Sequence, residues 1–149
     1  MQLSEHFTLE EMIRTRTGLK NEPTEEAKAN LIRLCALLEA VRALINAPMI
    51  LHSAYRCAAV NAAVGGSINP PSAHTQGRAS DFHPGNGLDI TEAFNAIRAS
   101  DIQFDKLIFE HKNGSWWIHI QIETLGENPR RLVYRAELKN GAMRYTLIK

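Results

Sequence analysis

The chain has 149 residues, of which 44% are hydrophobic and 22% charged, and its formal net charge is +1. This length fits a single domain over residues 1–149, large enough to bury a core without disulfides or a structural metal. So small a net charge creates no broad electrostatic field, so neither nucleic acid nor anionic lipid is expected as a partner.

The first part of the chain is expected to be mainly helical. Thr8 and Glu11 form a capping-box pattern that opens a short helix. Acidic residues in a first turn, followed by a regular apolar stripe, predict a long helix over residues 23–48. A strand over residues 49–56 and a short helix over residues 57–64 are expected to follow it.

A polar segment separates these elements from the second half. Residues 65–77 are rich in Gly, Pro, Ser and Asn and are expected to form a loop. A strand is expected over residues 78–84, and a second helix over residues 89–100 with Asp89 or Thr91 as its N-cap. No repeat, low-complexity segment or linker interrupts the chain, which agrees with one domain.

Two β-hairpins are expected near the C-terminus. The dipeptide Asn113-Gly114 is a strong hairpin signal and predicts paired antiparallel strands over residues 104–112 and 115–123. Residues 131–149 repeat this pattern around Asn140-Gly141, with no function beyond extending the sheet. The fold class predicted is α+β, an antiparallel β-sheet with helices packed on one side.

The first hairpin predicts which side chains share a face of the sheet. Successive strand residues alternate between faces, so Trp117, His119 and Gln121 share the polar face. The core face is expected to carry Trp116, Ile118, Ile120 and Ile122. A two-residue loop pairs Ile108 with His119, so Glu110 is a diagonal neighbour of that histidine. The hairpin therefore presents a glutamate and a histidine together.

A second polar pair lies in the stretch SAHTQGRASDFHP, residues 72–84, which places His74 and Asp81 seven residues apart. That spacing alone is weak evidence, because such pairs arise often by chance. With His119 they would supply two imidazoles and a carboxylate, a donor set for catalytic zinc with one position left for water. Zinc lowers the pKa of its water and polarises a carbonyl group. Glu110 is then placed to take up the proton of the water.

Neighbouring residues leave some alternatives open. His83 is a fallback ligand or a substrate contact at the rim of the site, whereas His52 is expected to be packed or hydrogen-bonded within a strand. Trp117 is either a wall for the substrate or a half-buried structural residue. Each of these alternatives depends on how the strands are placed side by side.

A resemblance to a known family rests on the segments SAYRCAAVNAAVGG, SAHTQGRASDF and WWIHI. Together they resemble the zinc D-Ala-D-Ala carboxypeptidase and peptidoglycan endopeptidase family, whose fold is shared with the hedgehog signalling domain. Its phage-type branch is also similar to the segments HFTLEEMIRT, NLIRLCALLEAVR and FDKLIFE. The resemblance covers nearly all of the chain up to about residue 123.

The resemblance implies roles for individual residues. The family pattern Ser-x-His-x-x-Gly-x-Ala-x-Asp is complete here from Ser72 to Asp81. It implies that zinc is held by His74, Asp81 and His119. It also implies that Arg56 and Ser72 bind the substrate, the arginine through carboxylate or carbonyl oxygens.

One position departs from the family pattern. Many members carry a glutamate or aspartate, the general base, three residues before the last histidine ligand, where this chain has Trp116. Either the base has moved or the activity is lost. The hairpin geometry favours Glu110 as the base, and some phage-type members carry a glutamate at that position.

These features predict a zinc-dependent peptidase that hydrolyses a peptide bond in peptidoglycan stem peptides or cross-links, with Glu110 and Arg56 as catalytic residues. The alternative is a non-catalytic relative that binds zinc and peptide as a virion or wall-binding module. No signal peptide and no apolar run near ~20 residues is found, so we expect cytoplasmic synthesis without membrane insertion. Action in the periplasm or cell wall would follow release, as for a phage endolysin. A monomer is the default, and the bond that is cut stays open.

Overall fold

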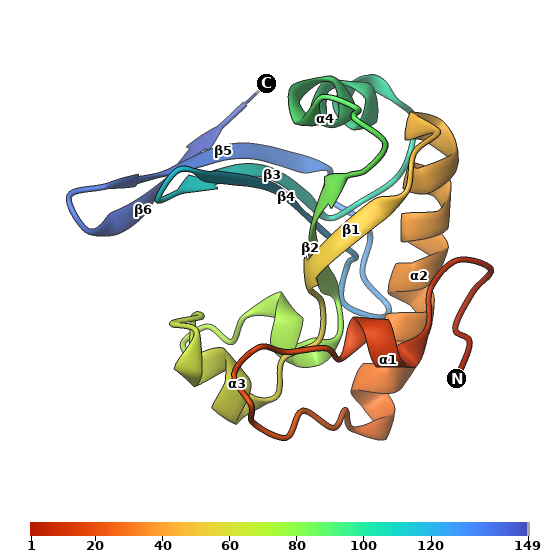
Figure 1. Cartoon of the computed structure of the whole chain (residues 1–149), viewed down its shortest axis with the longest axis vertical. Coiled ribbons are helices and arrows are strands. Elements are labelled where there is room, and N and C mark those ends of the chain that lie inside the picture. The colour runs from red at the N-terminus through yellow and green to blue at the C-terminus, as the bar shows by residue number, and fades with distance from the viewer. Residues whose placement is uncertain (149) are drawn as a thin grey trace.

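A six-stranded sheet forms the centre of the fold (Figure 1). The computed structural model describes residues 1–148, and its sheet has the strand order β1-β2-β4-β3-β5-β6. The strands are β1 (Met49–Ser53), β2 (Ala79–Pro84), β3 (Lys106–Lys112), β4 (Ser115–Gln121), β5 (Leu132–Lys139) and β6 (Ala142–Leu147). Neighbouring strands are antiparallel except β3 and β5, which run parallel. The α+β class with a mainly antiparallel sheet is therefore confirmed.

The parallel pair arises from the connection that follows β4. The predicted hairpin joins β3 and β4 at Asn113 and Gly114, whose φ angles of 52° and 79° are those that a two-residue turn needs. The chain then passes the end of β3 through residues 122–131 and adds β5 to the other edge of β3. A strand that follows β4 in this position starts in the same direction as β3, so the two are parallel.

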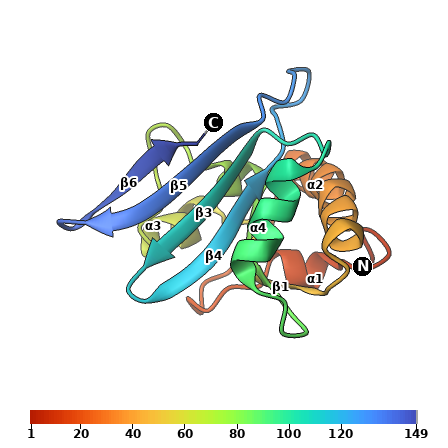
Figure 2. The same ribbon diagram turned by 90° about the horizontal axis from the view of Figure 1, so that it is seen from above.

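Two longer helices, α2 (Glu25–Ile45) and α4 (Ile90–Ala99), cover one face of the sheet (Figure 2). The Thr24 side chain caps α2 by accepting a hydrogen bond from a first-turn amide. Of the two caps predicted for α4, Asp89 accepts the hydrogen bonds. Asn46 ends α2 in the left-handed conformation, which asparagine adopts more readily than most residues.

The hydrophobic core lies between these helices and the apolar face of the sheet. Its fully buried side chains include Leu31, Leu34, Leu38, Ile97, Leu107, Ile118 and Ile120. Burying one such side chain contributes about 1.5–3 kcal/mol. Trp116 lies on this face but is 37% exposed, because it sits at the hairpin end, where its ring stacks on His111 with centroids 4.1 Å apart. The prediction that Trp116 is a core residue is thus wrong in its burial.

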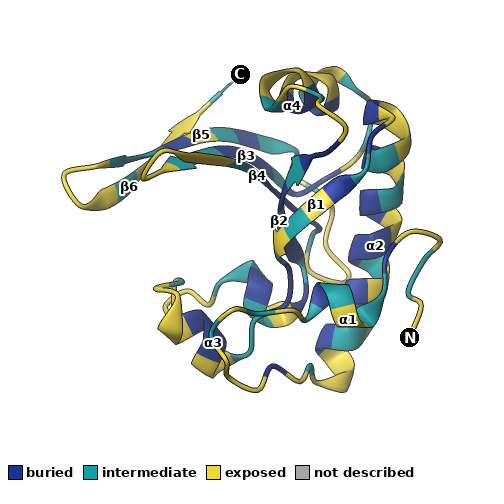
Figure 3. Ribbon diagram, in the orientation of Figure 1, coloured by how far each residue is buried: buried dark blue, intermediate teal, exposed yellow. Residues whose placement is uncertain are grey.

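The other face of the sheet is polar and faces the shorter helical segments (Figure 1). These are α3 (Ala58–Ala63) and the 3₁₀ turn η1 (Ala73–Gln76), whereas α1 (Leu9–Met12) packs near β1. The prediction that helices pack on one side of the sheet therefore holds for α2 and α4, whereas α3 and η1 lie on the opposite side. Buried residues concentrate between α2, α4 and the sheet, and the β5–β6 tip is exposed (Figure 3). Among residues 1–148, no helix has both the length and the apolar character required to span a bilayer.

Candidate metal centre and active site

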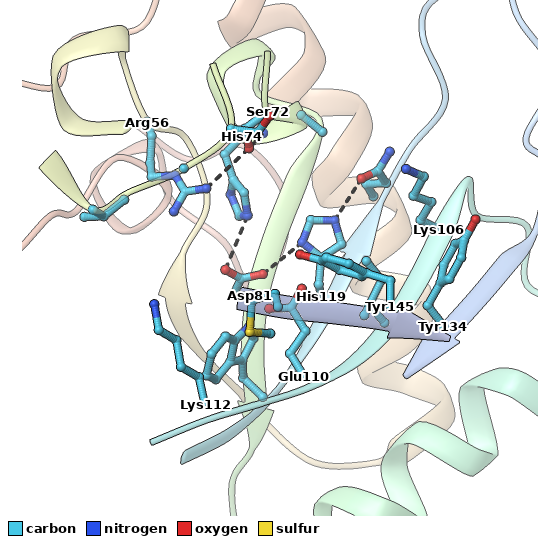
Figure 4. Close-up of a pocket in the computed structure, with 18 of the residues that line it drawn as sticks. Arg56, Ser72, His74, Asp81, Lys106, Glu110, Lys112, His119, Tyr134 and Tyr145 are labelled. Atoms are coloured by element: carbon cyan, nitrogen blue, oxygen red, sulfur yellow. Dashed lines mark hydrogen bonds and ion pairs between the residues drawn. The ribbon is translucent and has the colours of Figure 1, made fainter. Parts of the chain in front are cut away.

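Three side chains with metal-ligating atoms converge on the polar face (Figure 4). His74 comes from η1, Asp81 from β2 and His119 from β4. His74 Nε2 lies 3.3 Å from Asp81 Oδ2, and His119 Nδ1 lies 3.0 Å from Asp81 Oδ1. One potential ligand atom of each residue lies within 4.8 Å of the others. The fold thus brings together the three residues that the sequence analysis selected.

Strand pairing and one tight turn set these positions. Asp81 is the direct partner of His119 in the β2–β4 ladder, so their side chains share a face. Ser72 caps η1, since its Oγ accepts a hydrogen bond of 3.3 Å from the backbone N–H of His74. Gly77 ends the turn with a φ of 72°, and a Cβ there would lie 2.4 Å from a backbone carbonyl oxygen of α2. Only glycine fits this position of the motif.

The tautomer of His74 is fixed by a backbone carbonyl group on the side of the ring away from Asp81. Its Nδ1 lies 2.6 Å from the carbonyl oxygen of Ala54, which can only accept a hydrogen bond. Nδ1 therefore carries the proton, and the Nε2 lone pair faces Asp81. Burial lowers the pKa of His74 despite the charge of Asp81, which favours the neutral form that a metal ligand requires.

The tautomer of His119 is fixed by a chain of buried polar groups. His119 Nε2 lies 2.8 Å from Gln121 Oε1, and Gln121 Nε2 donates a hydrogen bond of 3.1 Å to Asp105 Oδ2. Arg130 binds the same carboxylate through Nε and Nη2, at 2.9 and 2.8 Å. Because a carboxylate only accepts, the Gln121 amide nitrogen must face Asp105 and its oxygen must face His119. His119 Nε2 therefore carries a proton, and Nδ1, which lies 3.0 Å from Asp81 Oδ1, is the atom that a metal would take.

The electrostatics of the cluster suit a bound cation. Burial opposes ionisation of Asp81, but His74 and His119 outweigh it and hold the pKa of Asp81 well below its usual range. Burial likewise opposes protonation of His119, but its hydrogen bond to Asp81 and the charge of that carboxylate raise the pKa of His119. An ionised carboxylate and two oriented imidazoles are a donor set that fits a zinc ion.

Glu110 lies on the same face, as the predicted register requires. Ile108 pairs with His119 and Glu110 with Trp117 across the β3–β4 ladder. Burial raises the pKa of Glu110 to about 7, and the charge of Asp81 acts in the same direction. A carboxyl group with this pKa exchanges protons readily near neutral pH, which is the property of a general acid or base.

A cavity of about 500 Å³ contains the cluster and the other predicted site residues. Arg56, Ser72, Glu110 and Trp117 line it, and Arg56 Nη2 donates a hydrogen bond of 3.3 Å to Ser72 Oγ. In Figure 4 Arg56 lies on the same side of Asp81 as Lys112, opposite Lys106 and Tyr134. The arrangement places a cation, a proton-exchanging carboxyl group and a candidate metal centre around one cavity.

A sequence profile of the peptidase M15 family, described as Peptidase M15, matches residues 5–121. The chain belongs to the peptidase M15 family. The family resemblance drawn from the sequence is confirmed, and membership supports metal-dependent peptidase chemistry. A comparison with curated proteins finds no match. The phage-type branch stays a prediction.

In this M15 peptidase, two further histidines are kept away from the cluster. His52 Nε2 and His83 Nδ1 are hydrogen-bonded to each other across β1 and β2. Neither lines the cavity that holds His74 and Asp81. The structure therefore favours the expectation of a hydrogen-bonded His52 and does not place His83 as a ligand.

The last hairpin of this M15 peptidase lines the cavity, a role that the sequence analysis did not find. Tyr134, Met143 and Tyr145 from β5 and β6 contribute to its wall, although the profile match ends before them. Ala136 pairs with Glu110 on one side and with Tyr145 on the other, so all three share a face. Burial, together with the charges of Glu110 and Asp81, raises the pKa of Tyr145. Only knowledge of the β3–β5 pairing could have placed this tyrosine near the cluster.

Proposed function

We propose that this M15 peptidase hydrolyses a peptide bond in peptidoglycan stem peptides or cross-links, with zinc held by His74, Asp81 and His119. The observation that carries the proposal is the half-buried Glu110, on the same face as His119 and in the same cavity, with a pKa of about 7. This placement supports Glu110 as the general base in a chain that has Trp116 at the usual base position.

We assign a separate role in hydrolysis to each of the site residues. A bound zinc ion would lower the pKa of a water molecule to about 7 and polarise the substrate carbonyl. Glu110 accepts the proton of the attacking water and delivers it to the leaving amine. Arg56 and Ser72 orient the substrate by hydrogen bonds, those of the arginine being charge-assisted. Trp117 forms a wall beside the peptide.

The location of this activity follows from the substrate. Peptidoglycan lies outside the cytoplasmic membrane, so the enzyme would act in the periplasm or cell wall after its release, as an endolysin does. A monomer suffices for this proposal, because the cavity is formed by residues of one chain.

The proposal is tested with Glu110→Gln, which keeps the size of the side chain but cannot accept the proton. Turnover of purified peptidoglycan and of a synthetic D-Ala-D-Ala peptide should fall by about 10²–10⁴-fold, the usual contribution of general acid–base catalysis. Elemental mass spectrometry should still find zinc in the variant. Glu92→Gln, at an exposed position in the first turn of α4, is the matched control and should keep full activity.

Two outcomes would contradict the proposal. Full activity in Glu110→Gln would remove this residue from the chemistry. A wild-type protein that binds zinc and wall peptides without cleaving them would instead support the alternative, a non-catalytic zinc- and peptide-binding relative.

A further inference from the structure

Two further cavities adjoin the candidate active site on its Arg56 and Lys112 side. One, of about 290 Å³, is lined by residues that include Arg14, Arg16 and Arg56. The other, of about 550 Å³, is lined by residues that include Arg16, Lys112 and the paired His52 and His83. We call the surface formed by Arg14, Arg16, His52, His83 and Lys112 the cationic groove.

The three cavities share their walls. Arg56 lines both the metal cavity and the first side cavity, and Trp117 lines both the metal cavity and the second. Arg16 and His52 line both side cavities. A ligand that enters the metal cavity past Arg56 or Trp117 therefore reaches the cationic groove.

The charge of the groove is one-sided. No aspartate or glutamate lines either side cavity, whereas the metal cavity holds Asp81 and Glu110. Within residues 1–148, Arg16 and Lys112 are exposed and form no salt bridge with a carboxylate. Arg14 interacts with the charge of Glu11, which does not line the groove. The whole chain has a net charge of only +1, so this concentration of positive charge is local.

One buried donor marks the junction between the metal cavity and the first side cavity. Arg56 Nε is buried and has no hydrogen-bond partner within residues 1–148. Such groups are rare in folded proteins because each costs about 1–3 kcal/mol when left unpaired. A guanidinium N–H only donates, so its partner must be an acceptor, and the carbonyl and carboxylate oxygens of a peptide are acceptors of this kind.

We propose that the cationic groove binds carboxylates of the peptide substrate that lie away from the bond to be cut. This inference rests on the proposed peptidase function and makes it more specific: stem peptides with a free α-carboxylate on D-glutamate are preferred over amidated ones. The guanidinium group of Arg16 matches a carboxylate through two parallel hydrogen bonds. Because Arg16 is exposed, its contribution is modest and falls as salt screens it.

The inference is tested by binding, with no turnover required. Isothermal titration of zinc-loaded Glu110→Gln would compare a synthetic stem pentapeptide with its counterpart amidated at the D-glutamate α-carboxylate. The free form is expected to bind about fivefold more tightly, the upper range for one exposed ion pair. Adding Arg16→Gln should bring the two affinities together, and high salt should do the same. Arg144→Gln, an exposed position on β6 whose neighbour Tyr145 faces the cavity, is the control and should leave the preference intact.

Each result decides the inference. Equal affinities for the two peptides, no binding of either, or an Arg16→Gln loss that is the same for both would overturn it. Inorganic polyphosphate that competes with both peptides to the same extent would point to a general anion site instead. Wild-type enzyme that cleaves both peptides with equal kcat/KM supports the proposed peptidase but overturns the groove. A clear carboxylate preference without any cleavage supports the groove and refutes the peptidase.

Discussion

Asp105 is predicted to control metal affinity without touching the metal. Its carboxylate is buried and fixes the direction of the Gln121 amide, which in turn holds the proton of His119 on Nε2. Asp105→Asn replaces an acceptor with a group that also donates, so the Gln121 amide can turn over. His119 would then lose the restraint that keeps its Nδ1 directed at Asp81.

The size of the effect follows from the hydrogen bond between His119 and Gln121. A buried neutral hydrogen bond contributes about 0.5–1.5 kcal/mol, and about 1.4 kcal/mol corresponds to a factor of ten. If this energy separates two tautomers, its loss lowers the binding-competent fraction, and the apparent affinity falls by the same factor. Loss of a residue that orients a ligand commonly costs about 10–100-fold in affinity. We therefore expect zinc to bind about tenfold more weakly to Asp105→Asn.

Competition with a chromophoric chelator at fixed neutral pH measures this change. Nitrogen NMR shifts of the metal-free protein report the His119 tautomer directly. Arg130→Gln keeps the Asp105 carboxylate that orients Gln121, so it should lower stability and should weaken zinc binding less than Asp105→Asn does. Asp101→Asn, at an exposed position, controls for loss of charge. A folded Asp105→Asn protein with unchanged zinc affinity and an unchanged tautomer would refute the reasoning.

Three further predictions concern stability and reactivity. Gly77→Ala should destabilise the fold by more than about 2 kcal/mol in urea unfolding. The added Cβ would overlap a carbonyl oxygen of α2, and residue 77 itself has a left-handed backbone conformation that alanine rarely adopts. Burial raises the pKa of the Cys35 thiol to about 12, so an alkylating reagent at mildly alkaline pH should modify it only after unfolding. Burial opposes ionisation of Glu39, but hydrogen bonds from Ser4 and His6 outweigh it and lower its pKa below 4.5. The ionised carboxylate therefore stabilises the fold at a pH above the pKa of Glu39 in the unfolded chain, and this stabilisation is lost as the pH falls through the lower pKa of the folded state. Glu39→Gln should thus destabilise the protein at neutral pH but not in acid.

The results that would contradict these three predictions are equally direct. A Gly77→Ala protein as stable as wild type would mean that α2 moves away at little cost. Fast modification of Cys35 in the native protein would show that its site opens. A Glu39→Gln penalty that persists unchanged in acid would come from packing and not from the ionised carboxylate.

Local rules were sufficient for the parts of the site that depend on one hairpin. Asn113 and Gly114 fix the turn, the turn fixes the β3–β4 register, and the register places Glu110 beside His119. The same reasoning misjudged Trp116, because its exposure depends on where the covering helices end. Alternation of side chains gives the face of a residue, whereas burial depends on what packs against that face.

Partners that lie far apart in the sequence could not be predicted in this way. Gln121 was placed on the face of His119, but nothing local indicates that Asp105 and Arg130 orient its amide. The place of β5 next to β3 has no turn signal either, because the connection is long and the pairing parallel. Tyr145 therefore entered the site only through the structure.

Two residues of the C-terminal segment lie close to the metal centre, on different sides of it. Arg130 holds Asp105 behind His119, while Tyr145 faces the cavity in front of it, in line with Glu110. Both residues lie beyond the part of the chain that matches the family profile. The ligands and the base thus come from the shared family region, and part of their orientation and one wall of their cavity come from the segment that follows. Differences in substrate between members of such a family can then arise in this segment without any change in the ligands.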